Sequence, residues 1–179
     1  TKVASLSGKV PTLAGCHRRD RLAGVAGDAA ADEVCGHSAK HATVAPMKAI
    51  NLNAALGEGF GPWCMGDDAA LLTLVGAANV ACGGHAGDAM TMRATCAAAA
   101  ARGVDIGAHP GFDDKPGFGR RAYAVAPDEA AALVAAQTGA MIGSAALAGA
   151  RVAHVKPHGA LNTLACAARA LADAVAMAV

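Results

Sequence analysis

Short apolar runs and longer alanine-rich segments alternate along the chain from residue 47 onward. The short runs have the length of buried strands, and the longer segments have the length of helices. The predicted strands are 49–53, 79–82, 104–108 and 151–155, and the predicted helices are 67–74, 89–102, 127–147 and 167–179. This alternation, with short connections, predicts an α/β fold in which helices cover a parallel sheet.

Polar residues gather directly after each predicted strand. The four loops at these positions are rich in glycine and ionisable groups, and they span residues 53–61, 83–88, 109–121 and 156–159. In open parallel sheets and in β/α barrels, the carboxyl ends of the strands lie at one edge, where ligands bind. The four loops therefore predict a single site.

The first 46 residues differ from the rest of the chain. They contain scattered glycine, serine, histidine and basic residues, and they show no sustained period of two or 3.6 residues. We expect an irregular extension that is not native to the domain, which would begin at Met47. A short packed subdomain is the alternative, but few large apolar residues are present to offset the entropy of ordering it.

Composition narrows the function classes. The formal net charge of +1 gives no basic surface for nucleic acid or an anionic membrane. Gly, His, Asp or Arg interrupts every apolar stretch before it reaches about 18 residues, so we expect no membrane span. No secretory signal is readable, which predicts a cytoplasmic protein. The six cysteines include no CxxC pair, which favours reduced, mostly buried thiols over disulfides.

Three histidines follow predicted strands. His85 lies in a glycine-rich loop three residues before Asp88, so these two can act as base and orienting group, although the same pattern is typical of a plain turn. His109 precedes Pro110, which disfavours helical geometry at His109, and it is equally consistent with a structural histidine. Together with His158, the histidines are suited to acid/base work or to binding a divalent metal such as zinc or manganese.

Cationic side chains lie in two of the same loops. Lys156 leaves the fourth strand beside a proline, which suggests a fixed cation for an anionic substrate or an oxyanion. Arg120 and Arg121 lie near Asp113 and Asp114 and are suited to recognising a carboxylate or a phosphate. Solvated surface side chains are the alternative in both cases.

Glu58 lies in a glycine-rich segment, Leu56-Gly-Glu-Gly-Phe-Gly61. The segment superficially resembles a phosphate-binding loop. It contains neither the GxGxxG pattern nor the GK[ST] ending that such loops use, so we predict no nucleotide site there.

These loops together resemble the LamB/YcsF family. Five motifs carry the resemblance, in the family's order and approximate spacing, from Met47 to the end of the chain. They are Leu52-Asn53 with Leu56-Gly-Glu-Gly-Phe-Gly61, Ala78-Asn-Val-Ala-Cys-Gly-Gly-His-Ala-Gly-Asp88, Gly107-Ala-His-Pro110, Gly117-Phe-Gly-Arg-Arg121 and Val155-Lys-Pro-His-Gly-Ala-Leu161.

The resemblance implies an incomplete, distorted β/α barrel akin to glycosidase and polysaccharide deacetylase barrels, with its C-terminal part missing from this chain. It implies the A subunit of an ATP-dependent 5-oxoprolinase, which opens the lactam of 5-oxo-L-proline to give L-glutamate. The family's ATP-using step is placed with the partner B and C subunits. This chain would then receive the activated lactam.

The resemblance also implies roles for residues of the motifs. His85 or Asp88 would activate water, Lys156 and His158 would stabilise the oxyanion, and Arg120 or Arg121 would hold a substrate carboxylate or phosphate. The motifs add Glu58 and His109 to the catalytic candidates. They add Asn53, Asn79 and Asp114 to the substrate-binding candidates.

The chain departs from the family pattern at the first strand. The family reads Asp-Leu-Asn-x-Asp-Leu-Gly-Glu there, whereas this chain has Asn51 and Ala55 in place of the two acids, and Asn162-Thr163 replaces a later Tyr-Asn. The loss of a carboxylate at Ala55 supports an alternative, a binding module that keeps the ligand loops without turnover. A metal-dependent carbohydrate deacetylase is a further alternative by fold analogy, but it expects an acidic ligand where Ala55 stands.

Overall fold

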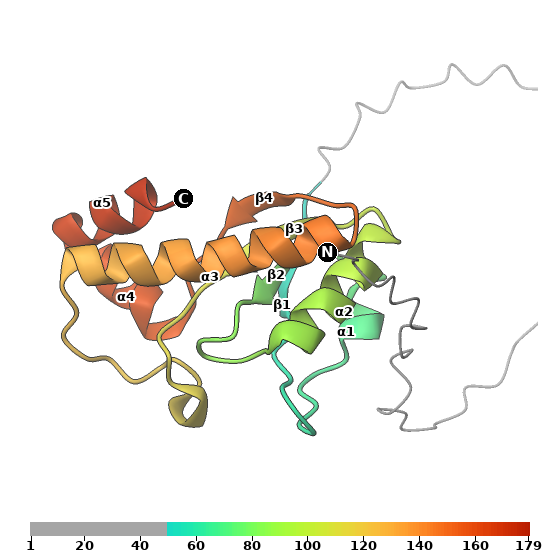
Figure 1. Ribbon diagram of the computed structural model, residues 1–179, viewed down its shortest axis with the longest axis horizontal. Helices are drawn as coiled ribbons and strands as arrows, with labels where there is room; N and C mark the ends of the chain where they lie inside the picture. Colours follow the sequence, from blue (N-terminus) through green and yellow to red (C-terminus); the bar gives the residue numbers. More distant parts are fainter. Residues whose placement is uncertain (1–49) are drawn as a thin grey trace, which may run out of the picture. The chain divides into compact units, whose positions relative to one another are not determined.

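The computed structural model describes residues 50–179, which form a four-stranded parallel sheet with helices between the strands (Figure 1). The strands are β1 (Asn53–Leu56), β2 (Ala77–Ala81), β3 (Asp105–His109) and β4 (Val152–Val155), and they lie in the order β1-β2-β3-β4. The predicted α/β class and parallel sheet are confirmed. The expectation for residues 1–46 lies outside the described part of the chain.

Helices follow each of the strands. They are α1 (Asp68–Leu71), α2 (Ala89–Ala100), α3 (Pro127–Leu147), α4 (Gly159–Ala167) and α5 (Arg169–Met177), and a short 3₁₀ turn, η1, covers Lys115–Gly117. Each parallel pair of strands is joined through at least one of them, which is the connection that parallel pairing requires. Because consecutive strands are neighbours in the sheet, all the loops after the strands open at the same edge.

The main core lies between the sheet and the helices α1, α2 and α3. Alternate strand residues, including Leu56, Val80 and Ile106, are buried against Met92 of α2 and Met141 of α3. The side chains are mostly small, so the helices approach the strands closely. A second, smaller core joins α3, α4 and α5 around Phe112, and its members are Phe112, Ala130, Val134, Ala160, Leu161, Leu171 and Val175.

The remaining strand positions carry polar residues. Asn79 of β2 is 1% exposed, and its Nδ2 donates to Oδ1 of Asn53 at 2.8 Å and to the carbonyl of Ala54 at 3.2 Å. Its Oδ1 lies 2.9 Å from Nε2 of His154 on β4. The face of the sheet that points away from the main core therefore holds a hydrogen-bonded row of three polar side chains.

Two element predictions are corrected by packing. Strand β1 covers 53–56 rather than 49–53, because Leu56 is fully buried and pairs with Val80, whereas Ile50 and Leu52 are exposed. Helix α4 was not predicted, since Gly159 at its first residue made the segment resemble a loop. The bounds of α3 match the prediction at both ends.

Helix α3 is long and apolar enough to cross a membrane by length and composition alone, with a mean hydropathy of 1.5 over its best window. One such helix is weak evidence for a span, because helices that cover a sheet pass the same test. Buried residues recur along one side of α3, at Ala130, Val134, Thr138, Met141 and Ala145. This spacing of three or four residues is the pattern of a helix packed by one face.

The four cysteines of the described region are free thiols, as expected. Cys82 and Cys96 are buried, and burial raises their pKa values to about 12 and about 11. Cys64 and Cys166 are exposed. Burial of most thiols, which the sequence suggested, therefore holds for only half of these four.

Candidate active site

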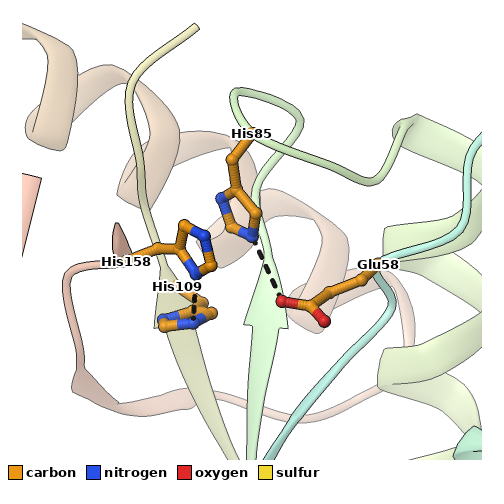
Figure 2. A group of neighbouring side chains, drawn as sticks. All are labelled: Glu58, His85, His109 and His158. Atoms are coloured by element: carbon orange, nitrogen blue, oxygen red, sulfur yellow. Dashed lines mark hydrogen bonds and ion pairs between the residues drawn. The ribbon is translucent and has the colours of Figure 1, made fainter. Parts of the chain in front are cut away.

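Four chemically active side chains meet at the carboxyl edge of the sheet. Glu58 follows β1, His85 follows β2, His109 ends β3, and His158 lies between β4 and α4. One potential ligand atom from each lies within 4.8 Å of those of the other three. Figure 2 shows that the four side chains converge although they come from four different segments. The sequence prediction that these loops build one site therefore agrees with the structure.

Glu58 and His85 form one half of this cluster. Nε2 of the fully buried His85 lies 3.4 Å from Oε1 of Glu58, whose side chain is 15% exposed. Burial raises the pKa of the Glu58 carboxyl, but the hydrogen bond to His85 and the nearby histidines outweigh burial and leave that pKa below its usual value. Nδ1 of His85 is buried and has no hydrogen-bond partner among the described residues.

His109 and His158 form the other half. Nε2 of His109 lies 3.1 Å from Nδ1 of His158. The second nitrogen of each ring contacts a backbone carbonyl, which is Lys156 O for His109 Nδ1 and Phe118 O, at 2.8 Å, for His158 Nε2. Burial lowers the pKa of His109 to about 4 and, with the neighbouring His85, also lowers the pKa of His158. Both rings are therefore neutral at physiological pH.

Ring packing fixes the cluster further. The rings of His85 and His158 are stacked, with centroids 3.6 Å apart and planes 6° from parallel. His109 and Phe118 meet these rings edge-on. The loop that carries Phe118 approaches so closely that a Cβ at Gly119 would lie 2.6 Å from Cβ of His85. Only glycine fits at that position, where φ is also positive at +61°.

Asp88, expected as a catalytic candidate, lies at the N-cap of α2. Its Oδ1 accepts from the backbone N–H of Thr91 and its Oδ2 accepts from that of Gly61, both at 2.8 Å. These two hydrogen bonds hold the pKa of the Asp88 carboxyl below its usual value. The residue joins α2 to the loop after β1 and is not a member of the four-residue cluster.

The cationic candidates lie around the cluster rather than in it. Lys156 is exposed, and it contacts the cluster through its backbone carbonyl. Arg121 forms an ion pair with Asp114, which also caps η1 through the N–H of Gly117. The Arg120 guanidinium lies over the ring of Phe118 at 5.6 Å and has no ion-pair partner in the described part of the chain.

Two residues at this site were not singled out from the sequence. His154 holds Asn79, and its only signal was a polar residue between the apolar positions of a predicted strand. Phe118 contributes its carbonyl to His158 and its ring to both stacked histidines, and it adopts a left-handed backbone with φ of 55°. No local sequence pattern marks such a conformation at a phenylalanine.

Comparison with known proteins extends this picture. Residues 50–179 match the LamB/YcsF family. A protein from Nocardia farcinica, named as the A subunit of 5-oxoprolinase, is 59% identical over 126 residues, which are 70% of this chain and 50% of that protein. A protein of the same name from Azoarcus sp. is 55% identical over 133 residues, covering 74% of this chain and 52% of that protein.

The solved structure of a lactam utilization protein from Thermus thermophilus superimposes with a TM-score of 0.71 at 44% identity. The match covers 72% of this chain and 52% of that one. The chain therefore spans about half the length of the relatives that it matches. The residues of the cluster all lie within the matched region.

Proposed function

Because the chain belongs to the LamB/YcsF family, we propose that it acts in the opening of 5-oxo-L-proline to L-glutamate, as the A subunit of a 5-oxoprolinase. The names of the relatives support the substrate, and their designation as one lettered subunit implies further subunits. The observation that carries the proposal to this chain is the convergence of Glu58, His85, His109 and His158 at the edge where parallel sheets bind ligands.

The chemistry accounts for a requirement for ATP. The lactam is a resonance-stabilised amide and therefore a poor electrophile. We place ATP with the partner B and C subunits, which would transfer a phosphoryl group to the lactam oxygen and release ADP. Water would then add to the ring carbon, the C–N bond would break with a proton going to nitrogen, and a second water would release phosphate from the resulting acyl phosphate. In this scheme, the chain described here opens the activated ring.

In this scheme His85 and Glu58 act as the proton-accepting pair. With Nε2–H directed at Glu58, Nδ1 of His85 is left as a base with no other partner in the described structure. The carboxylate then stabilises the imidazolium that forms. Both oxygens of Asp88 accept backbone hydrogen bonds, so its contribution is to hold the loop after β1 against α2.

Substrate binding falls to the residues at the rim of the cluster. Arg120 is the better candidate for the substrate carboxylate, since Arg121 is already paired with Asp114. Lys156, which is exposed at the same edge, is the candidate for stabilising the oxyanion. Nε2 of His158 already donates to Phe118, so its donor is not free for that task.

The test is reconstitution of the 179-residue chain with the B and C subunits of a relative, followed by measurement of 5-oxoproline-dependent glutamate and ADP. We expect turnover that His85→Asn lowers by about 100-fold or more, as for loss of a general base. Arg169→Ala, on the exposed side of α5, is the matched control and retains turnover. Turnover with the relative's own A subunit but none with the folded chain would refute the proposal.

One observation favours a second candidate, a binding module without turnover. Ala55 lies opposite Asn79 in the sheet register, so no carboxylate stands beside the buried polar row at this position. Calorimetric titration of the chain with 5-oxoproline separates the two candidates. Binding of the lactam together with absence of turnover in the reconstituted complex would support the module.

A cytoplasmic setting, expected from the sequence, is part of this proposal. The four free thiols of the described region support it, since cytoplasmic proteins keep their cysteines reduced.

A further inference from the structure

The proton positions in the cluster can be assigned from the backbone contacts. A carbonyl oxygen only accepts hydrogen bonds, so the ring nitrogens that contact Lys156 O and Phe118 O must carry protons. These nitrogens are Nδ1 of His109 and Nε2 of His158. In the neutral rings, Nε2 of His109 and Nδ1 of His158 are then both unprotonated, although they face each other at 3.1 Å.

Two bare nitrogen lone pairs at this distance repel each other unless a cation lies close to both. A shared proton is one such cation, but it would make one of the two rings an imidazolium. The rings are 2% and 5% exposed, and burial lowers both pKa values. A metal ion is the other cation, and it requires the deprotonated nitrogens that the carbonyl contacts enforce.

We propose that His109 Nε2, His158 Nδ1 and the carboxylate of Glu58 bind one divalent transition-metal ion. Two imidazoles on a tetrahedral zinc have their nitrogens about 3.3 Å apart, from bond lengths of about 2.0–2.1 Å. The observed 3.1 Å is close to this value. The Glu58 carboxylate, which lies within 4.8 Å of both nitrogens, completes a set of two histidines and one acid. Such a set leaves a coordination position open for water or substrate.

His85 acts through Glu58 rather than as a ligand. Its ring is stacked on that of His158 with nearly parallel planes, so the lone pairs of the two rings point along parallel lines and not at one ion. Its Nε2 faces Glu58 instead. A histidine that donates to a metal-binding carboxylate orients it, which makes His85 a positioning residue for the metal.

The donor set selects the class of metal. Two imidazole nitrogens and one carboxylate suit zinc, iron, cobalt or nickel, whereas calcium and magnesium prefer sites built from oxygen atoms. The same site serves the proposed ring opening, so this inference deepens that proposal. Its test therefore measures metal binding, which does not depend on turnover or on the partner subunits.

The experiment uses the untagged 179-residue chain, stripped with a chelator and dialysed against stoichiometric Zn²⁺. Metal is then counted by elemental analysis. His17, His37 and His41 lie outside the described residues, so the number that decides is the difference between wild type and variant. We expect wild type to bind one zinc more than His109→Asn or His158→Asn. The matched control is His154→Asn, a histidine of the same sheet that belongs to no part of the cluster, and it retains the ion.

Two further measurements keep the test decisive if a histidine variant does not fold. Glu58→Gln changes a partly exposed residue and is expected to weaken Zn²⁺ binding at least 10-fold, and His85→Asn is expected to weaken it by about 10–100-fold. X-ray absorption of the zinc-loaded wild-type chain is expected to show scattering from imidazole rings. Equal zinc content in wild type and the folded His109 and His158 variants, or scattering from oxygen ligands alone, would overturn the inference.

Discussion

The imidazole of His154 lies directly against Gly107, at the point where strand β3 has no Cβ. A Cβ at Gly107 would overlap the ring and would contact Nε2, Cδ2 and Cε1. The missing side chain lets the ring reach across the sheet, so that Nε2 lies 2.9 Å from Oδ1 of the buried Asn79. A glycine on one strand therefore decides whether the polar row on the sheet can form.

Gly107→Ala should destabilise the chain by about 1–3 kcal/mol, since the methyl group displaces His154 and leaves a buried amide oxygen without its partner. Urea denaturation followed by circular dichroism measures this change. Gly143→Ala in α3 is the control, because a Cβ there meets nothing within 4 Å. Alanine should be neutral or favourable by about 0.5–1 kcal/mol at that helical position. An equal response of the two variants would contradict the account of His154.

Asp88→Ala should lower the free energy of unfolding by about 1–2 kcal/mol, through loss of the cap on α2 and of the hydrogen bond to Gly61. Asp88→Asn keeps one acceptor oxygen and should cost less. In the reconstituted complex, Asp88→Asn should retain most of the turnover, because we assign this residue to structure. A loss as large as that of His85→Asn would instead return Asp88 to the catalytic residues.

The chain should lose stability as the pH rises from about 9 to about 12. Burial raises the pKa of the Cys82 thiol to about 12 from an ordinary value of 9.0, so the folded state keeps this proton more tightly than the unfolded state. The thiol's contribution is intact below pH 9 and is lost progressively above it, by up to about 4 kcal/mol. Denaturation curves at several pH values should fall less steeply with pH in Cys82→Ala. Parallel pH profiles for the two chains would refute this assignment.

Arg120→Ala and Arg121→Ala should have different effects in the reconstituted complex. Arg120 has no ion-pair partner among the described residues, so its loss should raise KM for 5-oxoproline with little change in stability. Arg121 holds Asp114, and its loss should loosen the loop and lower the melting temperature. Steady-state kinetics together with thermal melting of both variants makes the comparison. A higher KM in Arg121→Ala alone would exchange the two roles.

The sequence was sufficient for the alternation of strands and helices and for the meeting of three histidines. Both follow from a general property of parallel sheets, whose strands end at one edge. The position of β1 could not be read in the same way, because it depends on the burial of Leu56 opposite Val80 and not on the apolar Ile50 and Leu52. A local pattern does not report which apolar residues find partners.

The roles of single polar residues were harder to predict for a similar reason. A carboxylate that caps a helix and one that activates water have the same letter in the sequence, and only the two backbone amides that contact Asp88 distinguish them. The position of His154 depends on a glycine 47 residues earlier in the chain, on the neighbouring strand. Such relationships arise from contacts across strands and are not encoded in spacing.

Phe118 is the one non-glycine residue of the described region with a positive φ, and its carbonyl holds the proton on Nε2 of His158, 40 residues away. A bulky residue in this conformation stores strain of about 1–3 kcal/mol, which the packing around it must sustain. Relaxation of the loop would withdraw the carbonyl and let His158 tautomerise. A residue that offers no functional group of its own thereby couples backbone strain to the position of a proton.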